Sequence, residues 1–291
     1  MKLVTFTQGG TTRIGALVGE EVVDFSAASP DLPRDMVAFL NLGAPGMRAA
    51  RAACTSGRGR LAQASVTLEA PILRPPKILA VGLNYRDHVE ETGLKMPEIP
   101  MIFNKQSTSV VGPGHSIHLP IDSEQLDYEG EFAVVIGKRC RRVPKEHALD
   151  VIAGYTIVND VSVRDWQFRS ATTTMGKSWD THCPLGPYLV TTDEVLEPHG
   201  LQLRTWVNGE LRQNSNTKNL IFNCFDIIEH LSTAFTLEPG DVIPTGTPSG
   251  VGLGMNPKVW LKVGDVVRIA IDQLGELENR VMAEPKNTVL Y

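Results

Sequence analysis

The sequence lacks several features that mark specialised classes of protein. Its 291 residues include only four cysteines, which are widely spaced and form no CxxC pair, so a disulfide framework and a cysteine zinc site are both disfavoured. No apolar run approaches the roughly 18 residues that a membrane-spanning helix needs. The N-terminus also lacks the apolar stretch of a signal peptide. We therefore expect a protein of the reducing cytoplasm with no part in a membrane.

An excess of positive charge is also missing. Lysine and arginine together number 28 against 33 acidic residues, which gives a formal net charge of −5. Nucleic-acid binding needs clustered positive charge against the phosphates, so we expect no nucleic-acid partner. The hydrophobic and charged fractions, 42% and 21%, are ordinary for a globular protein and exclude a disordered chain or a coiled coil.

The hydrophobic pattern predicts a fold rich in strands. Three short strands are expected at 2–7, 12–18 and 21–25, followed by helical segments at 35–41 and 47–54. Three prolines within 71–76 favour an extended connector. We therefore expect a small β-rich N-terminal domain over 1–70 and a larger domain over 75–291.

In the larger domain, the sequence pattern is dominated by strands. Strand-like runs occur at 78–81, 129–136, 154–159, 188–191, 203–207 and 266–271, whereas 225–235 is the one strong helical segment. Strands this dense, without a helix between each pair, predict a mixed, β-rich α+β fold and argue against a Rossmann fold.

Three carboxylates stand at strand ends. Alternate side chains of a strand share a face, so Glu129 and Glu131 point the same way at the end of an apolar strand. Two like charges converging at a buried position are costly unless a cation or protons compensate them. Asp160 ends a second apolar run, and three such carboxylates suit Mg²⁺ or Mn²⁺. The alternative is a glutamate pair on an edge strand that faces water.

A second motif lies at 82–93, where we expect a helix of about two turns with Asn84 as its N-cap and Gly93 just beyond its end. His88 and Glu91 then share one face, where the carboxylate can orient the imidazole and raise its basicity, as a general base requires. The alternative is a salt bridge on a solvated helix.

Two loops offer anion-binding groups. Lys177 lies in the stretch TTTMGKS, which is not a nucleotide-binding loop because Ala171 replaces its first glycine. This lysine could bind a substrate carboxylate or an enolate, or could simply be solvated. The Gly- and Thr-rich loop 240–252 could hold a carboxylate near Thr247 through its backbone N–H groups, or could be an ordinary turn.

Taken in order, the segments 82–88, 128–138, 159–167, 176–180 and 240–252 resemble the fumarylacetoacetate hydrolase family, particularly members built around its C-terminal catalytic domain. The resemblance implies a mixed β-sandwich roll with a small β-rich N-terminal domain, usually in a homodimer. It also implies a Mg²⁺ or Mn²⁺ site at Glu129, Glu131 and Asp160, and a water-activating pair of His88 and Glu91. Substrate contacts are implied for Arg164, Gln167, Lys177 and Thr247, and we expect Lys177 to stabilise an enolate as well.

The longer members of this family add a fourth metal carboxylate upstream, but residues 82–84 offer no acid. This departure favours the smaller, acylpyruvate-type branch. We therefore expect a divalent-metal-dependent hydrolase of C–C bonds in 2,4-dioxo acids, which releases a 2-oxo acid such as pyruvate, as in the catabolism of aromatic compounds. The alternatives are an oxaloacetate decarboxylase or tautomerase, another lyase or isomerase that forms a metal-stabilised enolate, and an inert protein that only binds small acids.

Overall fold

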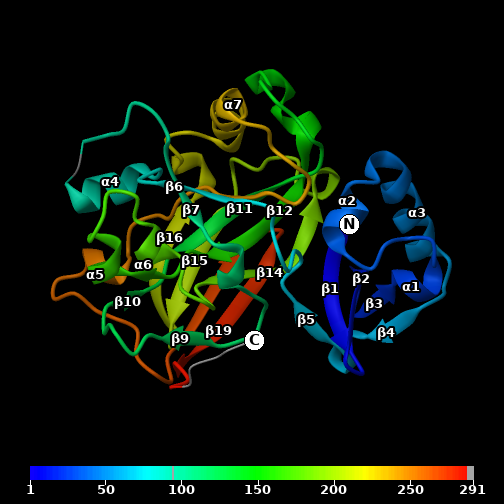
Figure 1. Ribbon diagram of the computed structural model, residues 1–291, viewed down its shortest axis with the longest axis horizontal. Helices are drawn as coiled ribbons and strands as arrows, with labels where there is room; N and C mark the ends of the chain where they lie inside the picture. The colour runs from blue at the N-terminus through cyan, green and yellow to red at the C-terminus, as the bar shows by residue number, and fades with distance from the viewer. Residues whose placement is uncertain (94, 287–291) are drawn as a thin grey trace.

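The computed structural model describes residues 1–93 and 95–286, and its largest element is a twelve-stranded sheet (Figure 1). The main path of this sheet runs through β4 (Arg60–Ala62), β3 (Glu21–Asp24), β2 (Thr11–Val18), β1 (Lys2–Gln8), β14 (Cys183–Thr191), β12 (Ile152–Asn159), β11 (Gly130–Ile136), β17 (Val242–Pro244), β6 (Ile78–Gly82) and β7 (Met101–Lys105). Off this path, β5 (Thr67–Glu69) pairs with β1 and β8 (Val110–Val111) pairs with β14. Every residue of β11 is buried, which matches its nearly continuous apolar sequence.

A second sheet of five strands covers one face of the first over β11, β12 and β14. Its order is β16 (Glu210–Asn216), β15 (Gln202–Val207), β18 (Val266–Ile271), β19 (Gly275–Ala283) and β9 (Ile117–Leu119). β11 packs against β15, β12 against β18, and β14 against β19. Phe132 and Val134 of β11 therefore share a core with Leu203 and Ile269 of the second sheet. β15 and β18 alternate between buried and half-buried residues, as expected for strands with one face on a core.

Helices gather at two ends of the molecule. α1 (Phe25–Ala28), α2 (Met36–Leu40) and α3 (Gly43–Thr55) lie beside the N-terminal strands, whereas α4 (Arg86–Thr92), α5 (Arg164–Gln167) and α6 (Thr174–Lys177) lie at the opposite end (Figure 1). α7 (Cys224–Ala234) begins with a capping box between Asn223 and Asp226, and its residues Ile227 and Leu231 join the core. The short elements are the strand pair β10 (Leu126–Asp127) with β13 (Ser162–Val163), and the 3₁₀ turns η1 (Gln63–Ser65), η2 (Ser107–Ser109), η3 (Lys145–Val151), η4 (Thr192–Glu194), η5 (Thr217–Asn219) and η6 (Gly252–Gly254).

This architecture confirms the mixed, β-rich α+β class predicted from the sequence. The predicted strands correspond to β1–β3, β6, β11, β12, β14, β15 and β18, and the predicted helix at 225–235 corresponds to α7. β1 pairs with β2 on one side and with β14 on the other, so the sheet continues from the N-terminal strands into the rest of the chain. The division at residues 70–75 stays a prediction. In the part of the chain that the structure describes, no helix has the length and apolarity to cross a membrane.

Candidate active site

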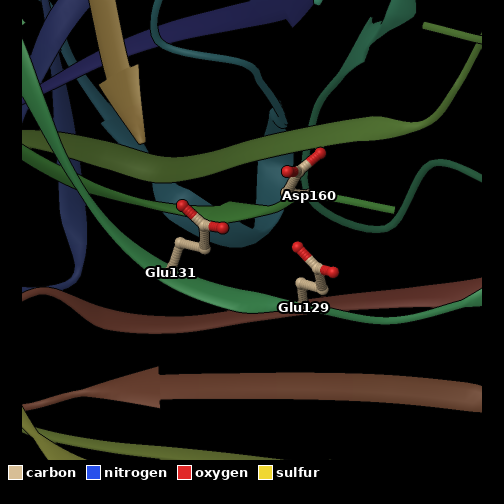
Figure 2. Close-up of side chains that lie close together, drawn as sticks. All are labelled: Glu129, Glu131 and Asp160. Atoms are coloured by element: carbon tan, nitrogen blue, oxygen red, sulfur yellow. The ribbon is translucent and has the colours of Figure 1, made fainter. Parts of the chain in front are cut away.

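Glu129, Glu131 and Asp160 converge on one point (Figure 2). One ligand oxygen from each lies within 4.8 Å of the other two, and all three residues are buried. The pairing of β11 with β12 brings them together, because Gly130 lies opposite Asn159 and the Asp160 amide donates to the Glu129 carbonyl at 2.8 Å. Their burial excludes the alternative of a glutamate pair that faces water.

Buried cations compensate two of these carboxylates. Lys177 Nζ donates to Glu129 Oε2 at 2.8 Å and to Asp160 Oδ2 at 2.9 Å, and Arg164 Nη1 lies 2.6 Å from Glu129 Oε1. Burial alone raises the pKa of Glu129, but Lys177 and Arg164 more than offset this and lower it to about 2. Lys177 is 2% exposed, so the alternative of a solvated lysine is wrong.

Glu131 is in a different electrostatic position. Its Oε2 accepts the Gly246 N–H at 2.7 Å, where a positive φ of 103° lets the backbone turn toward the carboxylate. Burial first, and then the negative charges of Asp160 and Glu129, raise the pKa of Glu131 well above its usual range. One carboxylate of the three therefore lacks sufficient compensating charge.

The charge balance of the buried cluster fits a divalent cation. Four buried carboxylates meet three buried cations there, namely Asp127, Glu129, Glu131 and Asp160 with Lys105, Arg164 and Lys177. The excess is negative, and the donors on offer are carboxylate oxygens, which are the preferred ligands of Mg²⁺ and Mn²⁺. The three residues Glu129, Glu131 and Asp160 thus suit a divalent metal, and the identity of the ion stays a prediction.

The His88–Glu91 pair lies on α4. His88 is buried, and its Nδ1 lies 3.2 Å from Glu91 Oε2. The other carboxylate oxygen of Glu91 accepts the Gly250 N–H at 2.9 Å, so the pair is tied to the glycine-rich loop. The burial of His88 and this link to the loop argue against a simple surface salt bridge. Gly93 ends the helix in a left-handed conformation, as predicted.

The predicted N-cap of this helix is wrong. Tyr85 occupies the N-cap position, and the Asn84 side chain instead donates to the carbonyls of Phe222 at 2.9 Å and Thr245 at 2.7 Å. Asn84 also accepts the Phe222 N–H at 2.8 Å. An amide that could cap its own helix is here used to fasten the start of α4 to two distant segments.

A cavity of about 280 Å³ connects these groups. Seven predicted site residues line it, namely His88, Glu129, Glu131, Arg164, Gln167, Lys177 and Thr247. Glu91 and Asp160 do not line the cavity, but they contact His88 and Lys177, which do. Apolar side chains, among them Leu83, Met101 and Phe103, complete the wall. A cavity of this size suits a small acid rather than a large ligand.

Several predicted substrate contacts already have partners within the protein. Arg164 Nε and Nη2 lie 2.9 Å and 2.7 Å from Asp127 Oδ2, and its Nη1 donates to Gln167 Oε1 at 2.9 Å. The Thr247 hydroxyl donates to the Gly130 carbonyl at 3.0 Å. Their roles as substrate contacts stay predictions.

Two further buried charges belong to this cluster and were not predicted. Lys105 Nζ donates to Asp160 Oδ1 at 2.6 Å and also to the Lys177 carbonyl. Asp127 accepts the N–H groups of Gly252 at 2.8 Å and Leu253 at 2.9 Å, which fixes the loop that borders the cavity. Lys105 ends the run MIFNK, and a charged residue at the end of such a run is the signal that could have indicated it.

Fold and site together define a β-rich α+β protein with a buried carboxylate centre beside a His–Glu pair. The family model for the C-terminal part of fumarylacetoacetate hydrolase matches residues 77–282, and the chain belongs to that family. The sequence is 43% identical to oxaloacetate tautomerase fahd2, mitochondrial, from Xenopus laevis, over 97% of this chain and 90% of that protein.

Solved structures agree. A fumarylacetoacetate hydrolase from Exiguobacterium antarcticum superposes with a TM-score of 0.87 at 38% identity, over 98% of this chain and 100% of that one. Maleylpyruvate hydrolase from Sphingobium sp. SYK-6, in complex with manganese(II) and pyruvate, superposes with a TM-score of 0.80 at 35% identity and the same coverage. The family thus includes hydrolases and a tautomerase, and the resemblance seen in the sequence is confirmed.

These names also correct one expectation. The Xenopus relative is named as a mitochondrial protein, as is the tautomerase Fahd2a from Rattus norvegicus, which is 44% identical over 91% of this chain and 85% of its own length. The expectation of a cytoplasmic protein is therefore wrong against these relatives. It rested on the sparse cysteines and on the lack of a signal peptide or membrane span, and all three observations fit any reducing compartment.

Proposed function

We propose that this protein is a divalent-metal-dependent enzyme that interconverts the keto and enol forms of oxaloacetate or a closely related 2-oxo acid. The observation that carries the proposal is the convergence of a negative carboxylate centre, a buried lysine and a His–Glu pair on one small cavity. The names of the tautomerase relatives support this reaction over the C–C hydrolysis expected from the sequence.

Glu129, Glu131 and Asp160 would hold the metal. A divalent ion bound there supplies Lewis-acid stabilisation of negative charge on a substrate oxygen. It also reverses the net negative charge of the cluster, which makes the cavity receptive to a carboxylate anion. We expect Mg²⁺ or Mn²⁺ in this role, since both prefer oxygen ligands.

The residues of the chain move the proton. His88 takes one proton from the carbon next to the oxo group, and Glu91 stabilises the imidazolium that results. The electron pair of the broken C–H bond forms the C=C bond, and the carbonyl oxygen gains the negative charge. Lys177 stabilises that charge as the enolate forms. The proton held by His88 then passes to the enolate oxygen, which completes the enol and restores the neutral imidazole. The return to the keto form follows the same steps backwards.

C–C hydrolysis of acylpyruvates is the second candidate. The His88–Glu91 pair favours it, because the same imidazole could take a proton from water, and maleylpyruvate hydrolase is a structural neighbour. Both reactions pass through an enolate. In tautomerisation His88 acts on carbon and a C–H bond breaks, whereas in hydrolysis His88 acts on water, which attacks the distal carbonyl, and a C–C bond breaks. A small 2-oxo or 2,4-dioxo acid as ligand and a homodimeric assembly belong to the proposal in either case.

The test follows both reactions in parallel. Enol absorbance of oxaloacetate and pyruvate release from a short acylpyruvate are measured with Mg²⁺, with Mn²⁺ and with chelator, against the metal alone. We expect metal-dependent acceleration of the enol–keto change above the metal-only control. Metal-dependent pyruvate release from the acylpyruvate without that acceleration would replace the proposal by the second candidate. Inactivity in both assays with both metals contradicts both.

A further inference from the structure

β16 is an end strand of the second sheet. Two of its side chains, from alternate residues, point inward and contact the site. The burial of β16 alternates, so that Gln213 and Ser215 are buried whereas Asn214, between them, is exposed. These two side chains contact two different parts of the site, although β16 itself does not line the cavity.

Gln213 closes a ring of hydrogen bonds on the backbone of Gly130, the residue between Glu129 and Glu131. Its Oε1 accepts the Gly130 N–H at 3.0 Å, and its Nε2 donates to Thr247 Oγ1 at 2.7 Å. The Thr247 hydroxyl in turn donates to the Gly130 carbonyl at 3.0 Å. Both backbone groups of the residue between Glu129 and Glu131 are therefore fixed from one side.

Gly130 itself shows how closely the second sheet approaches. A Cβ atom added there would lie 2.3 Å from Thr205 Oγ1 and 3.2 Å from Gln213 Oε1. The spacing Glu-Gly-Glu thus leaves room for the neighbouring sheet to contact the backbone between the two acids.

Ser215 makes the matching contact on α4. Its hydroxyl donates to Asp87 Oδ2 at 2.7 Å, and Asp87 Oδ1 accepts the backbone N–H of His88 at 2.9 Å. Asp87 lies in the first turn of the helix, where a negative charge is favourable. Ser215 thus holds the end of α4 from which His88 projects.

We propose that Gln213 and Ser215 are positioning residues, through which β16 fixes the carboxylate centre and the His88 helix relative to each other. The proposal rests on the proposed function, since it assigns a role at that same site. Residues that orient metal ligands typically change metal affinity by about tenfold to a hundredfold when they are removed. The loss of one buried hydrogen bond to a charged group corresponds to about tenfold in an equilibrium or a rate.

The two residues have different expected effects. In Gln213→Leu we expect Mn²⁺ affinity, measured by electron paramagnetic resonance, to fall at least about tenfold. In Ser215→Ala we expect unchanged Mn²⁺ affinity, faster hydrogen exchange in residues 85–92, and a kcat lowered about tenfold with KM unchanged. Asn214→Ala, on the outer face of the same strand, is the control and leaves all of these unchanged.

Two of these readouts do not depend on any activity. Thr247→Val opens the same ring from its other side, so it lowers Mn²⁺ affinity even if Gln213→Leu fails to fold. Unchanged Mn²⁺ affinity in Thr247→Val or in folded Gln213→Leu, or unchanged exchange of α4 in Ser215→Ala, overturns the proposal. A wild-type protein that binds Mn²⁺ but does not act on oxaloacetate overturns the proposed reaction alone.

Discussion

The carboxylate centre and the His88–Glu91 pair border one cavity, yet the structure holds them in different ways. Glu129, Glu131 and Asp160 stand at the ends of two paired, buried strands. His88 and Glu91 lie on a seven-residue helix, which side-chain contacts fasten to loops and to β16. Preorganised charge needs a fixed backbone, whereas a proton-transferring group can sit on an element that adjusts when a substrate enters.

The largest effect is expected when the carboxylate centre is disrupted. Glu131→Gln removes one negative charge but keeps an oxygen to accept the Gly246 N–H. We expect metal dependence to disappear and activity to fall about a thousandfold, since metal assistance contributes several kcal/mol to the barrier. Metal titration and the enol assay measure this, with Glu278→Gln on the exposed face of β19 as control. Retained metal-dependent activity would contradict the assignment of Glu131.

Disrupting the His88–Glu91 pair is expected to lower turnover without lowering metal affinity. His88→Ala removes the imidazole but leaves Glu129, Glu131 and Asp160 in place. We therefore expect Mn²⁺ affinity to stay within about twofold while turnover falls by at least about a hundredfold. His230→Ala, at an exposed position of α7, is the matched control. If turnover persists in His88→Ala, the proton is moved by another group.

A milder change tests the link between α4 and the glycine-rich loop. A Cβ added at Gly254 would lie 2.5–2.8 Å from the Glu91 carboxyl atoms, so Gly254→Ala pushes that carboxylate away. We expect kcat to fall about tenfold, by the loss of one charged hydrogen bond, with unchanged metal affinity. Gly200→Ala is the control, because a Cβ there meets nothing nearer than 3.8 Å. Equal kcat in both variants would show that this contact does not position Glu91.

The smallest expected effect is the release of a proton from Glu131 when the metal binds. The raised pKa of Glu131 means that this carboxyl binds a proton readily in the metal-free protein, and the metal must displace that proton. Metal affinity therefore falls as pH drops through this raised pKa, and binding below that pH releases about one proton. Calorimetry of metal binding to the wild-type protein in two buffers of different ionisation enthalpy measures the release. Equal heats in both buffers would argue against a protonated Glu131.

The same shift has a consequence for stability. A carboxyl whose pKa is raised in the folded state loses stabilisation as pH rises from its ordinary value through the raised one. Glu129 acts in the opposite sense, because its pKa of about 2 makes it stabilising until acid protonates it between its ordinary value and about 2. As the pH falls, protonation of Glu131 therefore raises the free energy of unfolding of the metal-free protein, whereas protonation of Glu129 lowers it.

The parts of the site that the sequence predicts are those set by local geometry. Glu129 and Glu131 follow from the two-residue period of a strand, and His88 and Glu91 from the spacing of a helix. Gln213 could not be placed in this way, because it reaches the site from β16 and its contacts depend on how distant strands pack. The run MIFNK could have indicated Lys105 as a candidate, but its contact with Asp160 also depends on strand packing. Asn84 was misassigned for a related reason, since an amide serves equally well as a local cap and as a long-range fastener.

The fold was predictable to a similar extent. Strands with continuous apolar sequence, such as β11 and β12, stood out, and so did the N-terminal strands with their glycine turns. β16 and β19 were missed because polar or charged residues occupy their exposed positions, as in ELRQNSN, and dilute the strand signal. The order of strands across two sheets is a property of tertiary packing that no local pattern encodes.

The pairing of β1 with β14 limits how early the large sheet can form during synthesis. Leu3 lies opposite Leu189, so the sheet that carries Glu129, Glu131 and Asp160 cannot close at this seam until β14 has been synthesised. Contacts so distant in sequence make folding slow, because a long loop must be closed before they form. A nascent chain therefore leaves Lys2 and Leu3 of β1 without their partners until β14 emerges, whereas β5 can pair with Thr5–Thr7 much earlier.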